Sequence, residues 1–174
     1  HSIRRRQRQM CIRDRVIVTV NKTAPTADAG SDATIDCNNT SATIGSSVVS
    51  GLTYAWSPST GLSATNVAQP TANPNTTTTY TLVVTNPANG CSSSDTVEVT
   101  VNTVTPTANA GSDATIDCNN TSATLGASAV SGLTYAWSPS TGLSSTTVAQ
   151  PTATPNNTTT YSLVVTNATT GCQS

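Results

Sequence analysis

The chain repeats itself after 81 residues, and this repeat constrains its fold more than any other feature. Residues 25–93 align with 106–174 without a gap, and 56 of the 69 aligned positions are identical. Segments this similar should fold alike, each as one structural unit. We therefore expect one small domain that is built twice.

The repeat is out of step with the start and the end of the chain. VIVTVN at 16–21 matches VEVTVN at 97–102, which follows the first copy of the repeat. We predict that 16–21 is the last strand of a preceding module. Module 1 is then 24–102, and module 2 is 105–174 without its last strand. On this interpretation the chain is a section of a longer array.

The first 15 residues differ in composition from the rest. Residues 1–15 hold all six Arg of the chain, whereas the remainder has one Lys and seven acidic residues. We interpret 1–15 as a non-native leader and leave it out of the fold. The remaining acidic chain lacks the basic surface that nucleic acids require. It also has no apolar run near the roughly 18 residues of a membrane span, so we expect neither a nucleic-acid partner nor membrane insertion.

The hydrophobic pattern of both modules indicates β-structure. Thr and Ser make up one third of the chain, and apolar residues alternate with polar ones in TYTLVVTN and TVEVTV. About seven short strands with turn signals between them predict an all-β fold with an Ig-like β-sandwich in each module. The predicted core aromatic residues are Tyr54, Trp56, Tyr80, Tyr135, Trp137 and Tyr161.

The residues that enzymes and metal sites need are scarce. The only His is His1, so neither a His-dependent triad nor a His metal site can be built in the modules. We expect no enzymatic activity and no cofactor. Asp28, Asp32 and Asp36 are weak candidate Ca²⁺ ligands, because Ca²⁺ takes 6–8 oxygen ligands and the second copy has Asn109 in place of Asp28. Solvated turn carboxylates are the better interpretation.

Four cysteines in the modules allow two sensible sets of disulfides. One set lies inside the modules, as Cys37–Cys91 and Cys118–Cys172. The other joins the modules through Cys37 and Cys172, which leaves Cys91 and Cys118 for neighbouring modules. In an Ig-like sandwich Cys37 and Cys91 would lie at opposite ends, so we slightly favour the pair between modules. Both sets remain open at this stage.

Several whole-module motifs resemble a known class of repeats. TADAGSDATIDC, LTYAWSPSTGL, PTANPNTTTTYTLVVTN and NGCSSSDTVEVTVN are similar to PKD-like and Ig-like tandem repeats of large Bacteroidota surface proteins. These include adhesins and gliding-motility proteins exported by the type IX system. YAWSPSTGL stands where a PKD domain has WDFGDG, so the likeness is to PKD-like repeats. The resemblance implies an extracellular, cell-surface location, and Asp95-Thr96-Val97 resembles a short O-glycosylation motif with Thr96 as the acceptor.

Together these features predict a non-enzymatic extracellular repeat that forms the stalk of a bacterial surface adhesin. Its expected partners are neighbouring repeats in the same chain, with surface glycans or proteins as further candidates. The alternative is a set of accessory spacer or carbohydrate-binding modules in a secreted multidomain hydrolase. The repeats would look alike in both cases.

Overall fold

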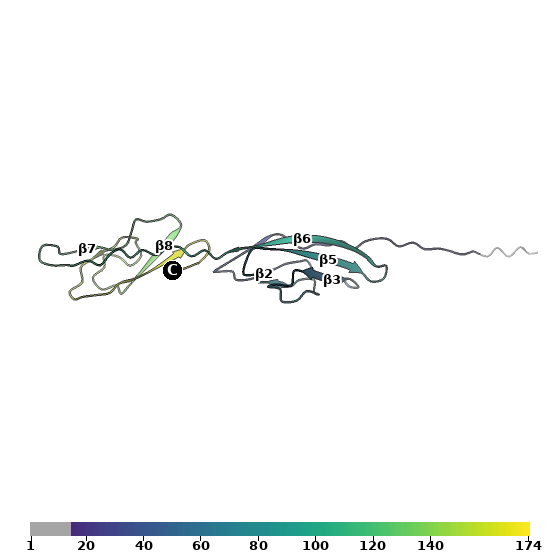
Figure 1. The fold of residues 1–174 in the computed structure, drawn as a ribbon, viewed down its shortest axis with the longest axis horizontal. Helices are drawn as coiled ribbons and strands as arrows, with labels where there is room; N and C mark the ends of the chain where they lie inside the picture. The colour runs from purple at the N-terminus through teal and green to yellow at the C-terminus, as the bar shows by residue number, and fades with distance from the viewer. Residues whose placement is uncertain (1–14) are drawn as a thin grey trace, which may run out of the picture.

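The computed structural model describes residues 15–174, so the predicted leader lies, apart from Arg15, outside the described residues. The described residues form ten strands and no helix. Figure 1 shows two groups of strands arranged end to end along an elongated molecule. The strands are β1 (Ala33–Asp36), β2 (Ala42–Thr43), β3 (Thr53–Ser57), β4 (Thr71–Ala72), β5 (Thr78–Asn86), β6 (Cys91–Asn102), β7 (Ala123–Thr124), β8 (Leu133–Ser138), β9 (Thr152–Ala153) and β10 (Ser162–Asn167).

Module 1 contains a four-stranded sheet in the order β1-β6-β5-β3 and a separate β2-β4 pair. Strand β1 is parallel to β6, whereas the other neighbours in the sheet are antiparallel. The arrangement is consistent with a β-sandwich. Module 1 has six strands where the sequence predicted about seven, because the proline-containing stretch 58–74 forms only β4 and a single bridge between Leu62 and Ala72.

The core of module 1 follows the predicted alternation. Tyr80, Leu82 and Val84 of β5 are buried, as are Val97 and Val99 of β6. The polar ends of the buried aromatic residues are satisfied by backbone carbonyls. Trp56 Nε1 donates to Val67 O at 2.9 Å, and Tyr80 Oη donates to Thr60 O at 2.7 Å. Tyr54 is half-buried against the core, and its hydroxyl accepts the Val49 N–H at 2.7 Å.

Module 2 has nearly the same sequence but fewer strands. Its sheets are β10-β8 and β7-β9, and the described chain holds no counterpart of β6 in this module. The sequence ATID forms β1 at 33–36 but is not a strand at 114–117. The physical reason is that β1 exists only through its pairing with β6. The pairing partner, and not the local sequence, therefore decides whether this segment is a strand.

The aromatic residues of module 2 keep their hydrogen bonds, but one of them, Tyr161, loses part of its cover. Trp137 is 4% exposed and donates to Val148 O at 3.0 Å, 81 residues after the equivalent bond in module 1. Tyr161 still donates to Thr141 O at 2.6 Å. Tyr135 is half-buried, as its counterpart Tyr54 is, whereas Tyr161 is half-buried although its counterpart Tyr80 is fully buried. Tyr161, which was predicted as a core residue, is half-buried because no strand of the described chain covers it.

The carboxylate of Asp95 holds the edge of module 1 in place. The sequence did not predict this role. Asp95 Oδ2 on β6 accepts the backbone N–H of Ala29 at 2.8 Å, and Ala29 is fully buried. This bond and a second one from the Thr96 backbone hold the pKa of Asp95 below its ordinary value. Asp95 thus fixes the start of module 1 to its last strand.

The depressed pKa of Asp95 predicts a loss of stability in acid. Because the pKa is lower in the folded state, the stabilisation is complete above the unfolded pKa of about 3.9 and is lost as the pH falls through the folded value. We expect the urea midpoint of module 1 to fall below about pH 4. Asp95→Asn should flatten this fall, and urea titrations of both proteins from pH 7 to pH 2 will show it. Equal acid sensitivity in the two proteins would contradict the assignment.

Candidate functional site at the junction between the modules

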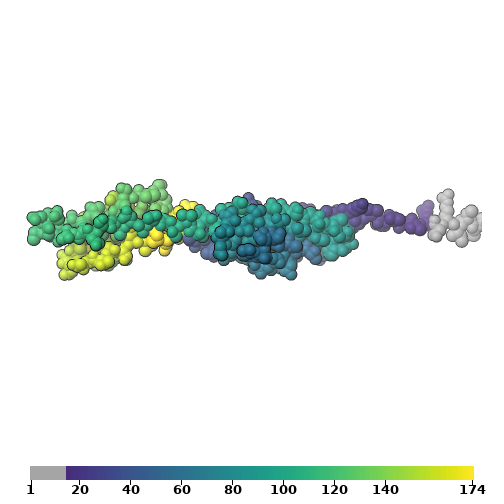
Figure 2. All heavy atoms as spheres, viewed as in Figure 1, coloured from purple at the N-terminus to yellow at the C-terminus, as the bar shows by residue number. Residues whose placement is uncertain are grey.

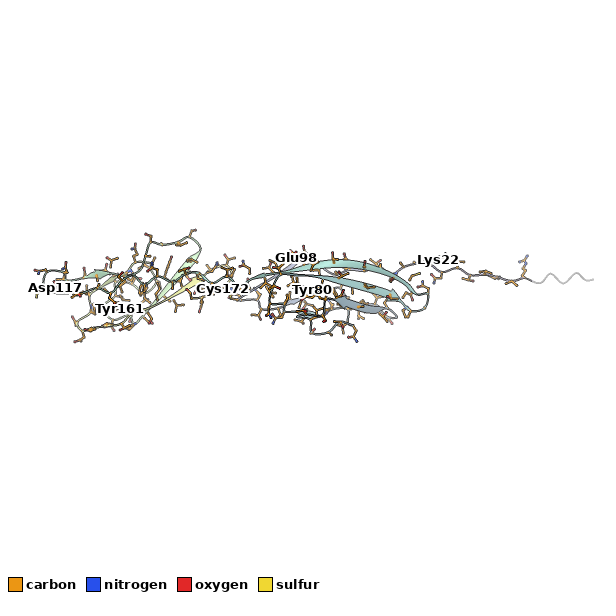
Figure 3. All side chains as sticks on the ribbon, viewed as in Figure 1. Lys22, Tyr80, Glu98, Asp117, Tyr161 and Cys172 are labelled. Atoms are coloured by element: carbon orange, nitrogen blue, oxygen red, sulfur yellow. A yellow bond between two sulfur atoms is a disulfide. The ribbon has the colours of Figure 1, made fainter. Side chains whose placement is uncertain are left out.

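A disulfide joins the two modules. Cys37 follows β1 in module 1, and Cys172 follows the loop after β10 in module 2. Their Cα atoms are 5.0 Å apart, although the two residues are 135 positions apart in sequence. This is the pairing between modules, and Figure 3 shows Cys172 at the junction of the two groups of strands. Consecutive modules are therefore covalently linked at their facing ends.

The geometry of β6 excludes the pairing inside module 1. Cys91 begins β6, whereas Asp36, which precedes Cys37, lies opposite Asn102 at the other end of that strand. Twelve residues of extended chain measure about 40 Å, far beyond the Cα separation that a disulfide allows. Cys91 and Cys118 are free thiols in the described structure.

Further contacts surround the disulfide. The Asn38 backbone N–H donates to Thr170 O at 3.2 Å, so the first residue after Cys37 is hydrogen-bonded to module 2. Cys172 Sγ lies 3.9 Å from the carbonyl oxygen of Asn102, where β6 leaves module 1. Gly171 faces the side chain of Asn38 so closely that a Cβ would overlap it. The junction combines covalent, polar and steric contacts.

These neighbours of the disulfide were missed by the sequence analysis. A turn at Gly171 is visible in the sequence, because its copy Gly90 follows Asn89 in a hairpin signal. Its contact with Asn38 depends on how the modules meet, and no local pattern reports that. The only sequence signal for the junction was the pair of cysteines.

The glycine at the junction provides a matched pair of substitutions. Gly171 and Gly90 have φ values of 69° and 71°, and each donates its N–H across an equivalent turn at 2.8 Å. A Cβ meets Asn38 at Gly171, but it meets nothing within 4 Å at Gly90. We expect Gly90→Ala to cost about 1 kcal/mol through its backbone alone. Gly171→Ala should cost more and should lower the hydrogen-exchange protection of the Asn38 amide.

Adding Asn38→Ala isolates the steric part of this effect. It removes the side chain that the new methyl group would meet, so the double variant should show only the backbone cost seen with Gly90→Ala. Urea titration and hydrogen exchange of the three variants provide the comparison. If Gly171→Ala and Gly90→Ala have the same effect on both readouts, the junction contact has no energetic role.

The three candidate calcium ligands do not form a common site. Asp28 Oδ1 accepts the Gly30 N–H at 3.0 Å, and Asp32 Oδ1 accepts the Glu98 N–H at 2.8 Å. Asp36 Oδ1 accepts backbone bonds in the turn that carries Cys37. Within residues 15–174, His, Cys, Asp and Glu side chains nowhere gather in a group of three that could hold a metal ion. Each carboxylate instead accepts hydrogen bonds from a different backbone segment.

Thr96 lies on the exposed side of β6, opposite Thr81 of β5. Its glycosylation stays a prediction. Within the described residues there is no helix with the length and apolarity needed to cross a bilayer. Comparison with protein-family models finds no match, and comparison with curated protein sequences finds none either.

Proposed function

We propose that this chain is a non-enzymatic, extracellular structural repeat that forms part of the stalk of a bacterial surface protein. The observation that carries the proposal is the Cys37–Cys172 disulfide, which links consecutive modules at their facing ends. Structural disulfides persist in oxidising, extracellular environments. The elongated end-to-end arrangement in Figure 2 suits a spacer that holds a distal domain away from the cell. The PKD-like and Ig-like character of the repeats belongs to the same proposal.

The position of the disulfide gives this stalk a specific mechanical property. A force applied to the two ends of the chain passes from Cys37 to Cys172 through the sulfur atoms. The segment between them spans 135 positions and carries no tension while the bond is intact. Fully extended, that segment would measure about 450 Å. The disulfide therefore limits how far the chain can lengthen even when a module unfolds.

Single-molecule stretching of the full chain from its two ends tests this function. Without reductant, we expect the final contour length to include only the segments outside the disulfide. With reductant, the contour length should increase by about 450 Å. The same final length under both conditions would show that the junction does not limit extension, and it would remove the support for a stalk that carries tension through this disulfide.

A glycan array with the intact chain separates the stalk from the carbohydrate-binding alternative. A stalk module has no need to bind sugars, so we expect no saturable binding. Saturable binding to a defined glycan would instead favour accessory modules of a secreted hydrolase or a directly adhesive repeat.

A further inference from the structure

The two sulfur atoms of the junction disulfide have different surroundings. Cys37 is exposed directly after β1, whereas Cys172 is 0% exposed at the junction of the two modules (Figure 3). Thiol–disulfide exchange begins when a thiolate attacks one of the two sulfur atoms, and the other sulfur atom then leaves as a thiolate. A thiol in solution can therefore attack this bond only at Cys37, and Cys172 has to be the leaving group.

The surroundings of Cys172 slow its departure. Cys172 Sγ lies 3.9 Å from the carbonyl oxygen of Asn102 and 3.9 Å from that of Thr170. The negative ends of two carbonyl dipoles therefore face the atom that would have to carry a negative charge. Burial adds to this effect, because it excludes the water that solvates a thiolate. The accessible sulfur atom is thus bonded to one that leaves with difficulty.

Contacts that do not involve sulfur also hold the junction together. The Asn38 N–H donates to Thr170 O at 3.2 Å, and the Asn38 side chain packs against Gly171. Neither contact requires the disulfide, so both keep Cys172 beside Cys37 after the bond has opened. A reacting group that is held next to its target acts at a high effective concentration. This arrangement favours the return of Cys172 over the attack of a second thiol from solution.

We propose that Cys37 is the site at which low-molecular-weight thiols add to this chain, and that the packed junction reverses the addition. In the forward step a thiolate RS⁻ forms a bond to Cys37 Sγ, the bond to Cys172 breaks, and Cys172 leaves with the electron pair and takes up a proton. In the reverse step Cys172 loses that proton, attacks Cys37 Sγ and expels RS⁻. Each step replaces one S–S bond by another, so neither step consumes an oxidant or a reductant.

Full reduction needs a second step, and this step distinguishes two classes of thiol. A second monothiol must attack the sulfur of the adduct on Cys37 from solution, in competition with Cys172. A dithiol such as dithiothreitol carries its second thiol in the adduct itself, closes to a cyclic disulfide and releases Cys37 as a thiolate. The products are one oxidised dithiothreitol and two protein thiols. Monothiols should therefore leave the junction closed at concentrations at which dithiols open it.

The return of Cys172 requires that the two modules stay in contact. While Asn38 remains bonded to Thr170, the junction closes again and expels the added thiol. When the modules separate, Cys172 is carried away and Cys37 keeps its adduct. The chain thus repairs its junction when it is packed and loses this ability when it is pulled apart. The inference depends on the contacts at the junction and not on the proposed stalk function.

Peptide mapping of trapped adducts tests the site of addition. The cysteines outside the junction, Cys91 and Cys118 among them, are first alkylated with iodoacetamide in the folded chain. The chain is then exposed to glutathione and quenched with acid. We expect glutathione on Cys37 and a free thiol on Cys172. In urea, where Cys172 is no longer buried, glutathione should appear on both residues. Glutathione on Cys172 of the folded chain, or no adduct at any glutathione concentration, overturns the proposal.

Titration with glutathione tests the return of Cys172 by measuring the concentration at which half of the junctions are open. Gly171→Ala places a methyl group against Asn38 and should lower this concentration at least about 10-fold. Gly90→Ala makes the equivalent change away from the junction and should leave it unchanged. Adding Asn38→Ala to Gly171→Ala should restore most of the difference.

Dithiothreitol provides the comparison between the two classes of thiol. It should open the junction of the parent chain at thiol concentrations at which glutathione leaves it closed. Equal half-opening concentrations in the parent chain and in Gly171→Ala overturn the proposal. Equal opening of the parent junction by glutathione and by dithiothreitol also overturns it, because Cys172 would then have no advantage over a thiol from solution.

Discussion

Val99→Asp is expected to unfold module 1. Val99 is fully buried and lies between two strands, opposite Ala33 of β1 and Thr78 of β5. A carboxylate at this position would be buried without a partner, which costs several kcal/mol, and the same change would loosen β1 because that strand pairs only with β6. We expect a loss of at least about 4 kcal/mol, which is a large part of the stability of a domain this small. Urea titration with hydrogen exchange will place the loss in module 1.

Val18→Asp is the matched control, because Val18 is the counterpart of Val99 in an otherwise nearly identical segment. Val18 is 80% exposed in the single chain, so at low protein concentration its replacement should change stability by less than about 0.5 kcal/mol. Similar losses in the two variants would mean that the strand environment is not what makes Val99 important. The comparison holds sequence nearly constant and varies only the pairing partners.

The strands with strong alternation were predictable from the sequence. Within 80–84 of β5 and 97–101 of β6 every second residue is apolar, and the structure buries Tyr80, Leu82, Val84, Val97 and Val99 as the pattern requires. Local alternation suffices there because the two strands form one hairpin. The all-β class followed from the same signal.

Features that depend on distant partners were not predictable in the same way. The parallel pairing of β1 with β6 joins residues more than 60 positions apart, and no local pattern identifies it. The identical ATID segments show the limit directly, since one is a strand and the other is not. Likewise, the sequence around Asp95 predicts only a strand. The hydrogen bond from the Ala29 N–H to its carboxylate depends on how the chain folds.

The cysteine pairing was an intermediate case. Spacing alone left two sets of disulfides open, and the choice between them rested on where the ends of a strand lie. Once Cys37 and Cys91 are assigned to opposite ends of β6, a pairing inside the module is geometrically excluded. The hairpin signal at Asn89-Gly90 predicts that the chain turns back there, which places Cys91 at one end of the module. The spacing of the cysteines alone does not give this position.

Cys37→Ser is expected to uncouple the two modules. The disulfide closes a loop of 135 positions, and cross-links of this size constrain the unfolded chain by about 4–5 kcal/mol in the chain-entropy treatment. Module 2 should lose most, because it lacks a covering strand and Cys172 is fully buried at its edge. Cys37 is the better position to change, since it is exposed and its replacement leaves no hydroxyl buried. Hydrogen exchange in 133–167 under mild urea will measure the loss.

Cys118→Ser is the control for this change, because Cys118 is the counterpart of Cys37, is exposed and forms no disulfide in the single chain. It should leave the exchange of 133–167 unchanged at low protein concentration. Small-angle scattering adds a second readout, since only Cys37→Ser should broaden the distribution of end-to-end distances. If both variants behave like the parent chain, the contact between Asn38 and Thr170 holds the modules in line without the disulfide. The stiffness of the rod would then come from polar contacts at the junction, and reductant would have no effect on its shape.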